Sequence, residues 1–320
     1  MLPAGVSVVI PVYRSARILP RLVERLEPVL AASAGGHELL LVDDASPDES
    51  WRVIRELARE RPWIRGIHLM RNYGQHGALL CGIRRARYAL TATMDDDLQH
   101  PPEELPKLLA ELERGYDVVY GAPEAEQHGL LRDLASRATK YALRSAMGTQ
   151  PALRVSALRV FRTEIREAFA QYSSPHVSVD VLLSWGTTRF GSLVVRHDPR
   201  SQGQSGYTFL KLMSHALNML TGFSTKPLQL AILTGILFTV FGFAVLVYVL
   251  VSYLVEGGSE PGFPFLASVI ALFSGAQMFA LGIIGEYLAR IHFRTMTRPS
   301  YSVRETTEVG LEAASTQESV

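Results

Sequence analysis

The chain has 320 residues, of which 48% are hydrophobic and 20% are charged. That length and composition suit one or two folded domains with apolar residues to spare, and they exclude a disordered or fibrous protein. The formal net charge of +1 provides no basic excess of the kind that binds a phosphate backbone, so nucleic acid is not expected as a partner.

The N-terminal region is expected to be cytosolic. No basic segment or cleavage site precedes the first apolar run, so no signal peptide is expected. The one cysteine, Cys81, cannot form an internal disulfide, which suits a reducing compartment. We expect Cys81 to be a small buried hydrophobe.

Residues 1–206 are predicted to form one cytoplasmic α/β domain. Its short apolar runs alternate with amphipathic stretches, a pattern typical of βαβ units and of a mostly parallel, Rossmann-like sheet. The predicted strands are Val6–Ile10, Glu38–Val42, Ile64–Met70, Ala89–Met94 and Asp117–Tyr120. The first predicted helix has apolar residues at helical spacing, and they are Leu19, Leu22, Val23, Leu26 and Leu30.

Polar segments follow the first four predicted strands. Ligands bind outside the carboxyl ends of the strands in open parallel sheets, so these segments predict a shared binding crevice. Turn and helix-cap chemistry would explain any one of the loops alone, but coincidence at four edges is less probable. The segments are Pro11-Val12-Tyr13, Asp43-Asp44-Ala45-Ser46, Arg71-Asn72-Tyr73-Gly74-Gln75-His76-Gly77 and Asp95-Asp96-Asp97.

The acidic triplet Asp95-Asp96-Asp97 suggests a site for a hard divalent cation. Such an ion keeps several positions for water and phosphate oxygens, so the cluster indicates a substrate that carries phosphate. A solvated acidic turn is the alternative. Pro101 and Pro102 follow the triplet and predict the start of a helix.

Basic residues collect between positions 123 and 207. If the segment from Asp133 to Met147 is helical, Arg137, Lys140 and Arg144 share one face. That face could meet an anionic membrane surface or a lipid phosphate, or it could be a solvated face of the domain. The polar segment from Arg200 to Tyr207 is predicted to be a loop that could close on an anion.

Two charge-free segments near the C-terminus predict a transmembrane hairpin. Residues 228–255 and 263–285 are each long enough to cross a hydrocarbon core of ~30 Å. The linker between them lacks lysine and arginine, whereas basic residues flank the pair, so both termini are expected in the cytoplasm with residues 286–320 as a tail. The flanking residues are Lys211, Lys226, Arg290, Arg294 and Arg298.

Residues 207–226 are predicted to form an amphipathic helix at the membrane interface. Apolar side chains from Phe209 to Leu220 share one face of this segment, opposite Lys211 and His215. A core helix of the soluble domain is the competing interpretation.

The motifs together resemble the polyprenyl-phosphate glycosyltransferases of glycosyltransferase family two. The likeness covers about residues 6 to 303 and includes the C-terminal hairpin, and it is closest to the subgroup that transfers formamido-arabinose or glucose to undecaprenyl phosphate. This resemblance implies a GT-A catalytic domain followed by interfacial helices and two membrane spans. The motifs are Val8-Val9-Ile10-Pro11-Val12-Tyr13, Leu41-Val42-Asp43-Asp44-Ala45-Ser46, Arg71-Asn72-Tyr73-Gly74-Gln75-His76 and Asp95-Asp96-Asp97-Leu98-Gln99-His100-Pro101-Pro102-Glu103.

The resemblance implies a transferase reaction. A sugar would move with inversion from a UDP- or GDP-sugar to a polyprenyl phosphate at the cytoplasmic face of the inner membrane. The resemblance also implies a homo-oligomer such as a tetramer. The implied donor-binding residues are Pro11, Tyr13, Asp43, Asp44, Arg71, Gly77 and Asp95. The implied ligands of Mg²⁺ or Mn²⁺ are Asp95, Asp97 and Gln99. The implied catalytic residues are Asp97, Arg159 and Arg200, and the implied acceptor-binding residues are Arg137, Lys140, Ser205 and Tyr207.

The chain departs from the family pattern at a few positions. Arg14 and Ser15 replace an asparagine and a glutamate, and Asp96 replaces a small residue in Asp-x-Asp. Ala157 stands where many relatives have an aspartate, and Gly206 where they often have a lysine. A phosphate acceptor is already largely ionised at neutral pH, so a missing general base need not abolish transfer.

Other functions fit the sequence less well. A nucleotide-dependent oxidoreductase would have a glycine fingerprint after the first strand, where Pro11-Val12-Tyr13-Arg14 stands instead. A processive polysaccharide synthase would be expected to have more spans. A non-catalytic relative that binds nucleotide-sugars or scaffolds a membrane complex is the main alternative.

Overall fold

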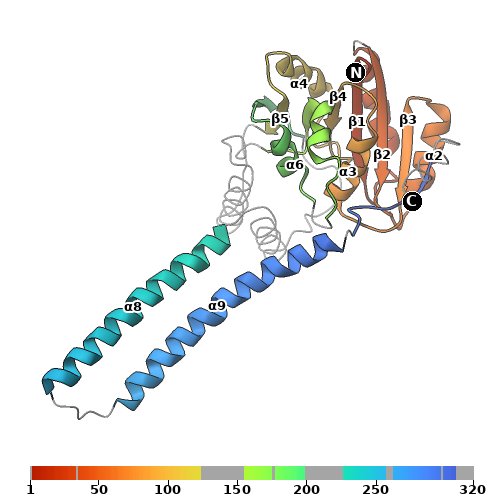
Figure 1. The fold of residues 1–320 in the computed structure, drawn as a ribbon. Helices are drawn as coiled ribbons and strands as arrows, with labels where there is room; N and C mark the ends of the chain where they lie inside the picture. The colour runs from red at the N-terminus through yellow and green to blue at the C-terminus, as the bar shows by residue number, and fades with distance from the viewer. Residues whose placement is uncertain are drawn as a thin grey trace.

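The computed structural model describes residues 2–33, 35–123, 155–174, 177–198, 226–256, 262–296 and 298–307. An α/β domain carries two long helices that project from one end of it (Figure 1). The predicted helix from Asp133 to Met147 and residues 207–225 of the predicted interfacial helix lie outside the described residues.

Eight strands form one sheet in the part of the chain that the structure describes, in the order β7-β5-β6-β4-β1-β2-β3-β8. Four neighbouring pairs are parallel and three are antiparallel, so the predicted α/β domain with a mostly parallel sheet is confirmed. The strands are β1 (Gly5–Val12), β2 (Gly36–Asp43), β3 (Ile64–Leu69), β4 (Leu90–Thr93), β5 (Val118–Pro123), β6 (Arg159–Arg162), β7 (Phe190–Val195) and β8 (Val303–Thr306).

Helices cover both faces of the sheet because the strands are apolar on both sides. Val8 and Ile10 of β1 belong to the core under α1 (Leu19–Ala31), α2 (Ser50–Glu60) and α4 (Leu105–Leu112). Val9 points to the opposite face, under α3 (Gln75–Arg85) and α6 (Val179–Gly186), as alternation along a strand requires. Cys81 is fully buried in this second core, as predicted.

In the described residues, the remaining short helices are of 3₁₀ type. The helix predicted after Pro101 begins as a 3₁₀ turn, Pro102–Glu104, and continues as α4. A second 3₁₀ segment, Thr163–Phe169, follows β6 and packs beside α6.

The two projecting helices are α8 (Lys226–Glu256) and α9 (Phe263–Thr295). Residues 228–248 of α8 and 272–289 of α9 have mean hydropathies of 2.6 and 1.3, enough in length and composition to cross a membrane. At most 6% of either window is buried, so neither is a core helix of the α/β domain. Exposed apolar helices of this length suggest association with a membrane.

The chain returns from α9 to the α/β domain. β8 pairs antiparallel with β3 and forms the outer edge of the sheet. We expected a tail over residues 286–320, and the structure instead describes the end of α9 and an edge strand within that range. The four residues of β8, Val-Arg-Glu-Thr, have no apolar run that would predict a strand.

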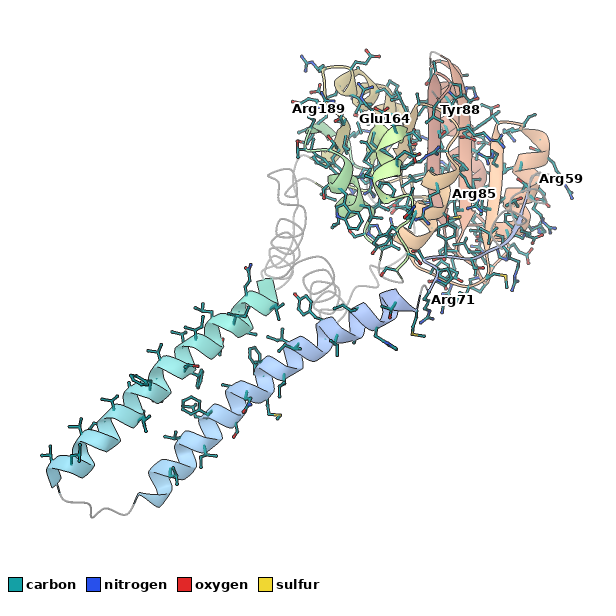
Figure 2. All side chains as sticks on the ribbon, viewed as in Figure 1. Arg59, Arg71, Arg85, Tyr88, Glu164 and Arg189 are labelled. Carbon is teal, nitrogen blue, oxygen red and sulfur yellow. The ribbon has the colours of Figure 1, made fainter. Side chains whose placement is uncertain are left out.

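The carboxyl ends of the parallel strands face the helical hairpin. Arg71, two residues after β3, lies at the end of the domain next to α9, whereas Tyr88, two residues before β4, lies at the opposite end (Figure 2). The loops that follow β1 to β4 therefore open on the side from which α8 and α9 project.

Close packing of α3 on β1 gives a first prediction. A Cβ at Gly82 would lie 2.3 Å from Cγ1 of Val9 and 3.2 Å from Cγ2 of Val42. We expect Gly82→Ala to lower the free energy of unfolding by about 1–3 kcal/mol, because overpacking outweighs alanine's better helix propensity. Thermal unfolding in detergent measures this. Arg55→Ala, at an exposed position of α2, is the control. Equal unfolding temperatures for wild type and Gly82→Ala would contradict the close packing of α3 on β1.

Candidate functional site

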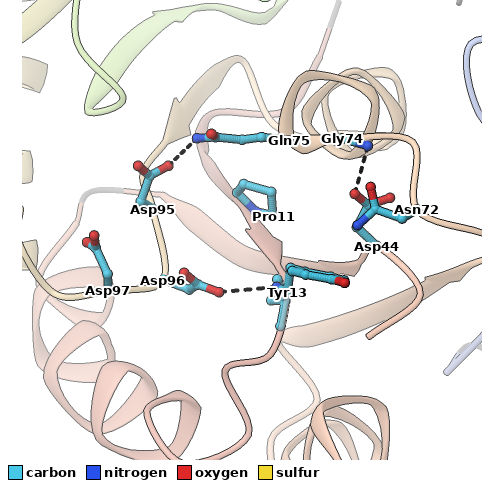
Figure 3. Close-up of a pocket in the computed structure, with 10 residues that line it drawn as sticks. Pro11, Tyr13, Asp44, Asn72, Gly74, Gln75, Asp95, Asp96 and Asp97 are labelled. Carbon is cyan, nitrogen blue, oxygen red and sulfur yellow. Dashed lines mark hydrogen bonds between the residues drawn. The ribbon is translucent and has the colours of Figure 1, made fainter. Parts of the chain in front are cut away.

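A pocket of about 240 Å³ lies at the carboxyl ends of β1 to β4 (Figure 3). Each of the four predicted loops contributes to its wall, so the structure brings the four strand ends together. The lining residues are Pro11, Val12, Tyr13, Asp44, Asn72, Gly74, Gln75, Asp95, Asp96 and Asp97.

The wall of the pocket is strongly acidic. Four of the ten lining residues are aspartates, and none of the ten is lysine, arginine or histidine. Carboxylates gathered in one site raise one another's free energy unless a cation or a proton compensates them. The pocket is therefore suited to a cation that accompanies an anionic ligand.

The three carboxylates of the acidic triplet do not point to one place. Asp95 and Asp97 lie on the same side of the pocket, whereas Asp96 is directed to Tyr13 (Figure 3). Among the described residues there is no group of three His, Cys, Asp or Glu side chains suited to a metal ion. Two carboxylates nevertheless fit Mg²⁺, which usually binds one or two of them and fills its other positions with phosphate and water.

Asp96 connects the acidic loop, Asp95-Asp96-Asp97, to the first loop. Its Oδ2 accepts a hydrogen bond from the Ser15 hydroxyl at 2.5 Å and one from the Tyr13 backbone N–H at 3.4 Å. Burial raises the pKa of Asp96, and the bond from Ser15 opposes that shift. Ser15 and Asp96 both depart from the pattern of the family that the sequence resembles, and the two residues contact each other.

Unusual backbone conformations occur in three of the four loops. Arg14, Ala45 and Leu98 have φ angles of +59°, +52° and +61°, and they are the non-glycine residues with positive φ in the described part of the chain. Each such residue costs about 1–2 kcal/mol, and such outliers cluster at ligand sites.

The two aspartates after β2 have different environments. Asp44 lines the pocket and accepts hydrogen bonds from the N–H groups of Tyr73 and Gly74 at 2.7 and 2.8 Å. Burial raises the pKa of Asp44, and these backbone bonds oppose the shift. Asp43 is fully buried and bonds Nδ1 of His68 at 2.6 Å, so it supports the pocket from behind.

The loop after β3 contributes residues that the sequence analysis did not select. Asn72, Gly74 and Gln75 line the pocket, and Nε2 of Gln75 donates to Asp95 at 2.5 Å. The selected neighbours lie outside the lining. Arg71 is exposed with its guanidinium over the Tyr73 ring, and Gly77 is buried within α3.

Arg159 is buried beneath the pocket. Its guanidinium forms an ion pair with Asp180, and its Nε donates to Oγ1 of Thr93 at 2.9 Å. Only 2% of Arg159 is exposed, so in this conformation it acts on Asp95 through the electric field and not by contact with a ligand. Of the other predicted catalytic and acceptor residues, Asp97 lines the pocket. The rest lie outside the described residues, and they are Arg200, Arg137, Lys140, Ser205 and Tyr207.

His100 lies three residues after the acidic triplet Asp95-Asp96-Asp97. Its ring packs edge-on against His197 with centroids 4.8 Å apart, and its Nε2 lies 3.2 Å from the Ser156 hydroxyl. Burial and the neighbouring His197 lower the pKa of His100 to about 4. Gln99, next to it, is partly buried, and its carbonyl accepts the Asp198 N–H at 2.8 Å.

The family model described as "Glycosyl transferase family 2" matches residues 7–168, the part of the chain that contains all four loops. The chain belongs to glycosyl transferase family 2. It is a glycosyltransferase with a GT-A-like fold, as the resemblance predicted.

Curated relatives match almost the whole chain. "Undecaprenyl-phosphate 4-deoxy-4-formamido-L-arabinose transferase" of Proteus mirabilis is 36% identical over 303 residues, which cover 94% of this chain and 93% of the relative. The protein of the same name from Photorhabdus laumondii is 35% identical over 304 residues, with the same coverage of both chains.

A solved glycosyl-transferring enzyme of another name has a similar fold. Glucosyl-3-phosphoglycerate synthase from Mycobacterium tuberculosis, in complex with Mn²⁺ and UDP-glucose, has a TM-score of 0.50 and 16% identity. The match covers 68% of this chain and 77% of that one.

The contact of Asp96 gives a second prediction. We expect Asp96→Ala to raise the KM for the sugar donor roughly tenfold, because the turn that carries Tyr13 loses two hydrogen bonds. Asp96→Asn keeps one acceptor oxygen and should have a smaller effect, and Ser15→Ala should shift KM in the same direction. Steady-state kinetics with both substrates measure this. A large loss of kcat at unchanged KM would instead assign Asp96 to the reacting groups.

The low pKa of His100 gives a third prediction. The unfolded imidazole takes up a proton near its ordinary pKa of about 6.5, while the folded one does so only near 4, so stability is lost as pH falls between those values. We expect this group to lower the free energy of unfolding by about 2 kcal/mol when the pH falls from 7 to 5. Thermal unfolding of the metal-free protein measures it. His100→Gln should lose less stability on acidification than wild type or a His37→Gln control, and equal pH dependence would contradict the assignment.

Proposed function

We propose that the protein transfers a sugar from a nucleotide-sugar to a polyprenyl phosphate at the cytoplasmic face of the inner membrane, with a divalent metal and with inversion at the anomeric carbon. The product would be a polyprenyl-phosphate-linked sugar for modification of a cell-envelope glycan. The names of the relatives, which are undecaprenyl-phosphate transferases, support the acceptor class.

One observation carries the proposal. The acidic pocket lies at the sheet edge that faces α8 and α9, the two apolar helices. A water-soluble donor can enter this pocket from the cytosol, while an acceptor held in the bilayer reaches the same side. An enzyme acting on two soluble substrates would have no need of this arrangement.

The chemistry needs little covalent help from the protein. A phosphate oxygen of the acceptor attacks the anomeric carbon, the bond from that carbon to the diphosphate breaks, and the nucleoside diphosphate leaves with the electron pair. The second pKa of a phosphate monoester is about 6, so the nucleophile is already anionic at neutral pH and a strong base is dispensable. A single displacement of this kind inverts the anomeric centre.

Different residues are assigned to the nucleoside, the metal and the acceptor phosphate. Pro11, Tyr13 and Asp44, which line the pocket, are assigned to the nucleoside, and Asp43, which bonds His68, is assigned to the support of their loop. Asp95 and Asp97 would hold Mg²⁺ or Mn²⁺, with Gln99 as the further proposed ligand, and the ion would neutralise charge on the diphosphate. Among the residues outside the structural description, Arg200, Ser205 and Tyr207 are proposed to meet the acceptor phosphate.

The charge pattern supports the proposed orientation. The basic residues on both sides of the hairpin belong on the cytoplasmic side by the positive-inside rule, and the linker between α8 and α9 has none. The α/β domain is joined to the hairpin at those basic ends, so we place it in the cytoplasm.

A transfer assay tests the proposal. Radiolabelled UDP- and GDP-sugars are offered to the detergent-solubilised full chain with undecaprenyl phosphate, in Mg²⁺, Mn²⁺ or EDTA. We expect label to enter the lipid only with metal, and Asp97→Asn to reduce the rate by about 10²–10³, because charge stabilisation of the leaving group is lost.

The control variant is Glu60→Gln, an acidic residue on the exposed side of α2, which should retain the wild-type rate. Transfer that persists in EDTA would contradict the proposed requirement for a divalent metal. If no sugar is transferred although one nucleotide-sugar binds, the protein would be a non-catalytic binding relative.

A further inference from the structure

The chain that leaves the membrane hairpin is built into the α/β domain. We define the return segment as residues 298–307, which begin three residues after the end of α9. Its β8 pairs with β3, and Thr307 completes the ladder by accepting the Gly66 N–H at its Oγ1, at 2.9 Å, and by donating its own N–H to the Gly66 carbonyl at 3.0 Å. The return segment is therefore an integral edge of the sheet that carries the pocket.

The return segment holds the start of the loop after β3. The Met70 N–H donates to the Ser302 carbonyl at 2.9 Å. The loop that begins at Met70 contributes Asn72 and Gly74 to the pocket and supplies the backbone donors to Asp44. A shift of residue 302 would therefore move that wall of the pocket.

The return segment also packs against α3. The ring of Tyr301 lies beneath the guanidinium groups of Arg84 and Arg85, each 5.8 Å from its centroid. The carbonyl of Ser300 is close enough to Gly77 that a Cβ there would lie 3.4 Å from it. The Tyr301 contacts lie at the last residues of α3, whereas the Ser300 contact at Gly77 lies in its first turn, next to Gln75 in the pocket lining.

A third connection runs from β8 to the buried aspartate. Glu305 accepts a hydrogen bond from the Trp51 indole N–H at 2.7 Å, and the Trp51 ring stacks on His68 with centroids 5.1 Å apart and planes 19° apart. His68 in turn bonds Asp43, whose carboxylate also accepts the Ser46 N–H at 3.3 Å. These contacts extend from the sheet edge to the loop after β2.

Ser46 carries the connection to the first loop. Its hydroxyl accepts the Arg14 N–H at 3.1 Å, next to Tyr13 in the pocket wall. Three of the four loops of the pocket are thus joined to the return segment, the loop after β3 directly and the loops after β2 and β1 through His68 and Asp43.

We propose that the return segment positions the donor pocket, with Glu305 and Thr307 as positioning residues for nucleotide binding, so that the membrane hairpin and the donor site form one mechanical unit. This inference rests on the proposed function, because it assigns the pocket to the nucleoside diphosphate. Neither residue touches the pocket, so each acts through the contacts described above.

Matched variants separate positioning from general stability. Glu305→Ala removes the acceptor for Trp51, whereas Glu305→Gln keeps an oxygen there. Thr307→Val removes the oxygen that receives the Gly66 N–H at nearly constant volume, whereas Thr307→Ser keeps it. Arg304→Ala, at the exposed position next to Glu305 in β8, is the control.

The experiment titrates UDP and GDP, each with Mn²⁺, into the full-length protein in detergent by calorimetry. We expect Glu305→Ala and Thr307→Val to raise the Kd of the bound nucleotide about fivefold, the effect of one hydrogen bond. Glu305→Gln, Thr307→Ser and Arg304→Ala should stay within twofold of wild type. In the transfer assay the donor KM should rise in parallel, while kcat and the acceptor KM stay unchanged.

The outcomes are distinguishable. Unchanged nucleotide affinity in both Glu305→Ala and Thr307→Val would overturn the positioning role, as would a loss of kcat that only follows a lowered melting temperature. Failure of the wild-type protein to bind either nucleotide would instead overturn the proposed function. If Thr307→Val does not fold, the Glu305 pair decides the question alone, because Trp51 and Glu305 lie at the surface.

Discussion

The site depends on one constraint, namely that β1 to β4 are parallel to one another and buried on both faces. Such strands can carry polar functional groups only at their ends, and parallel pairing brings those ends to one edge. The ladder of β2, β1 and β4 therefore sets the distance between the loop of Asp44, the loop of Tyr13 and the acidic loop. The relative positions of these three loops are therefore fixed by backbone hydrogen bonds within the sheet, outside the pocket itself.

The strand ends and the membrane helices could be predicted from the sequence because they follow from local periodicity. All five predicted strands correspond to β1 to β5, and the loops of the first four form the pocket. β6 and β8 could not be predicted in this way, because two of the four residues in each are charged and no apolar run marks the strand. β8 also pairs with a strand more than 230 positions earlier, a contact that no local pattern records.

Individual site residues were harder to predict because neighbouring residues face different ways. Asp43 and Asp44 are adjacent in a motif, yet the first is buried against His68 and the second lines the pocket. Asp96 likewise turns away from Asp95 and Asp97 to bond Ser15. The residue types were visible in the sequence, whereas the direction of each side chain depends on loop conformation, including the positive φ of Arg14 and Ala45.

The electrostatics of the pocket link its two proposed ligands. Four aspartates line it, and the raised pKa values of Asp44 and Asp96 show that burial already disfavours their charged forms. A diphosphate entering alone would add negative charge to this wall and meet no basic side chain among its lining residues. A divalent cation held by Asp95 and Asp97 would offset this negative charge and would attract the diphosphate. The donor and the metal are therefore expected to bind with strong positive coupling, each raising the affinity of the other by the same factor.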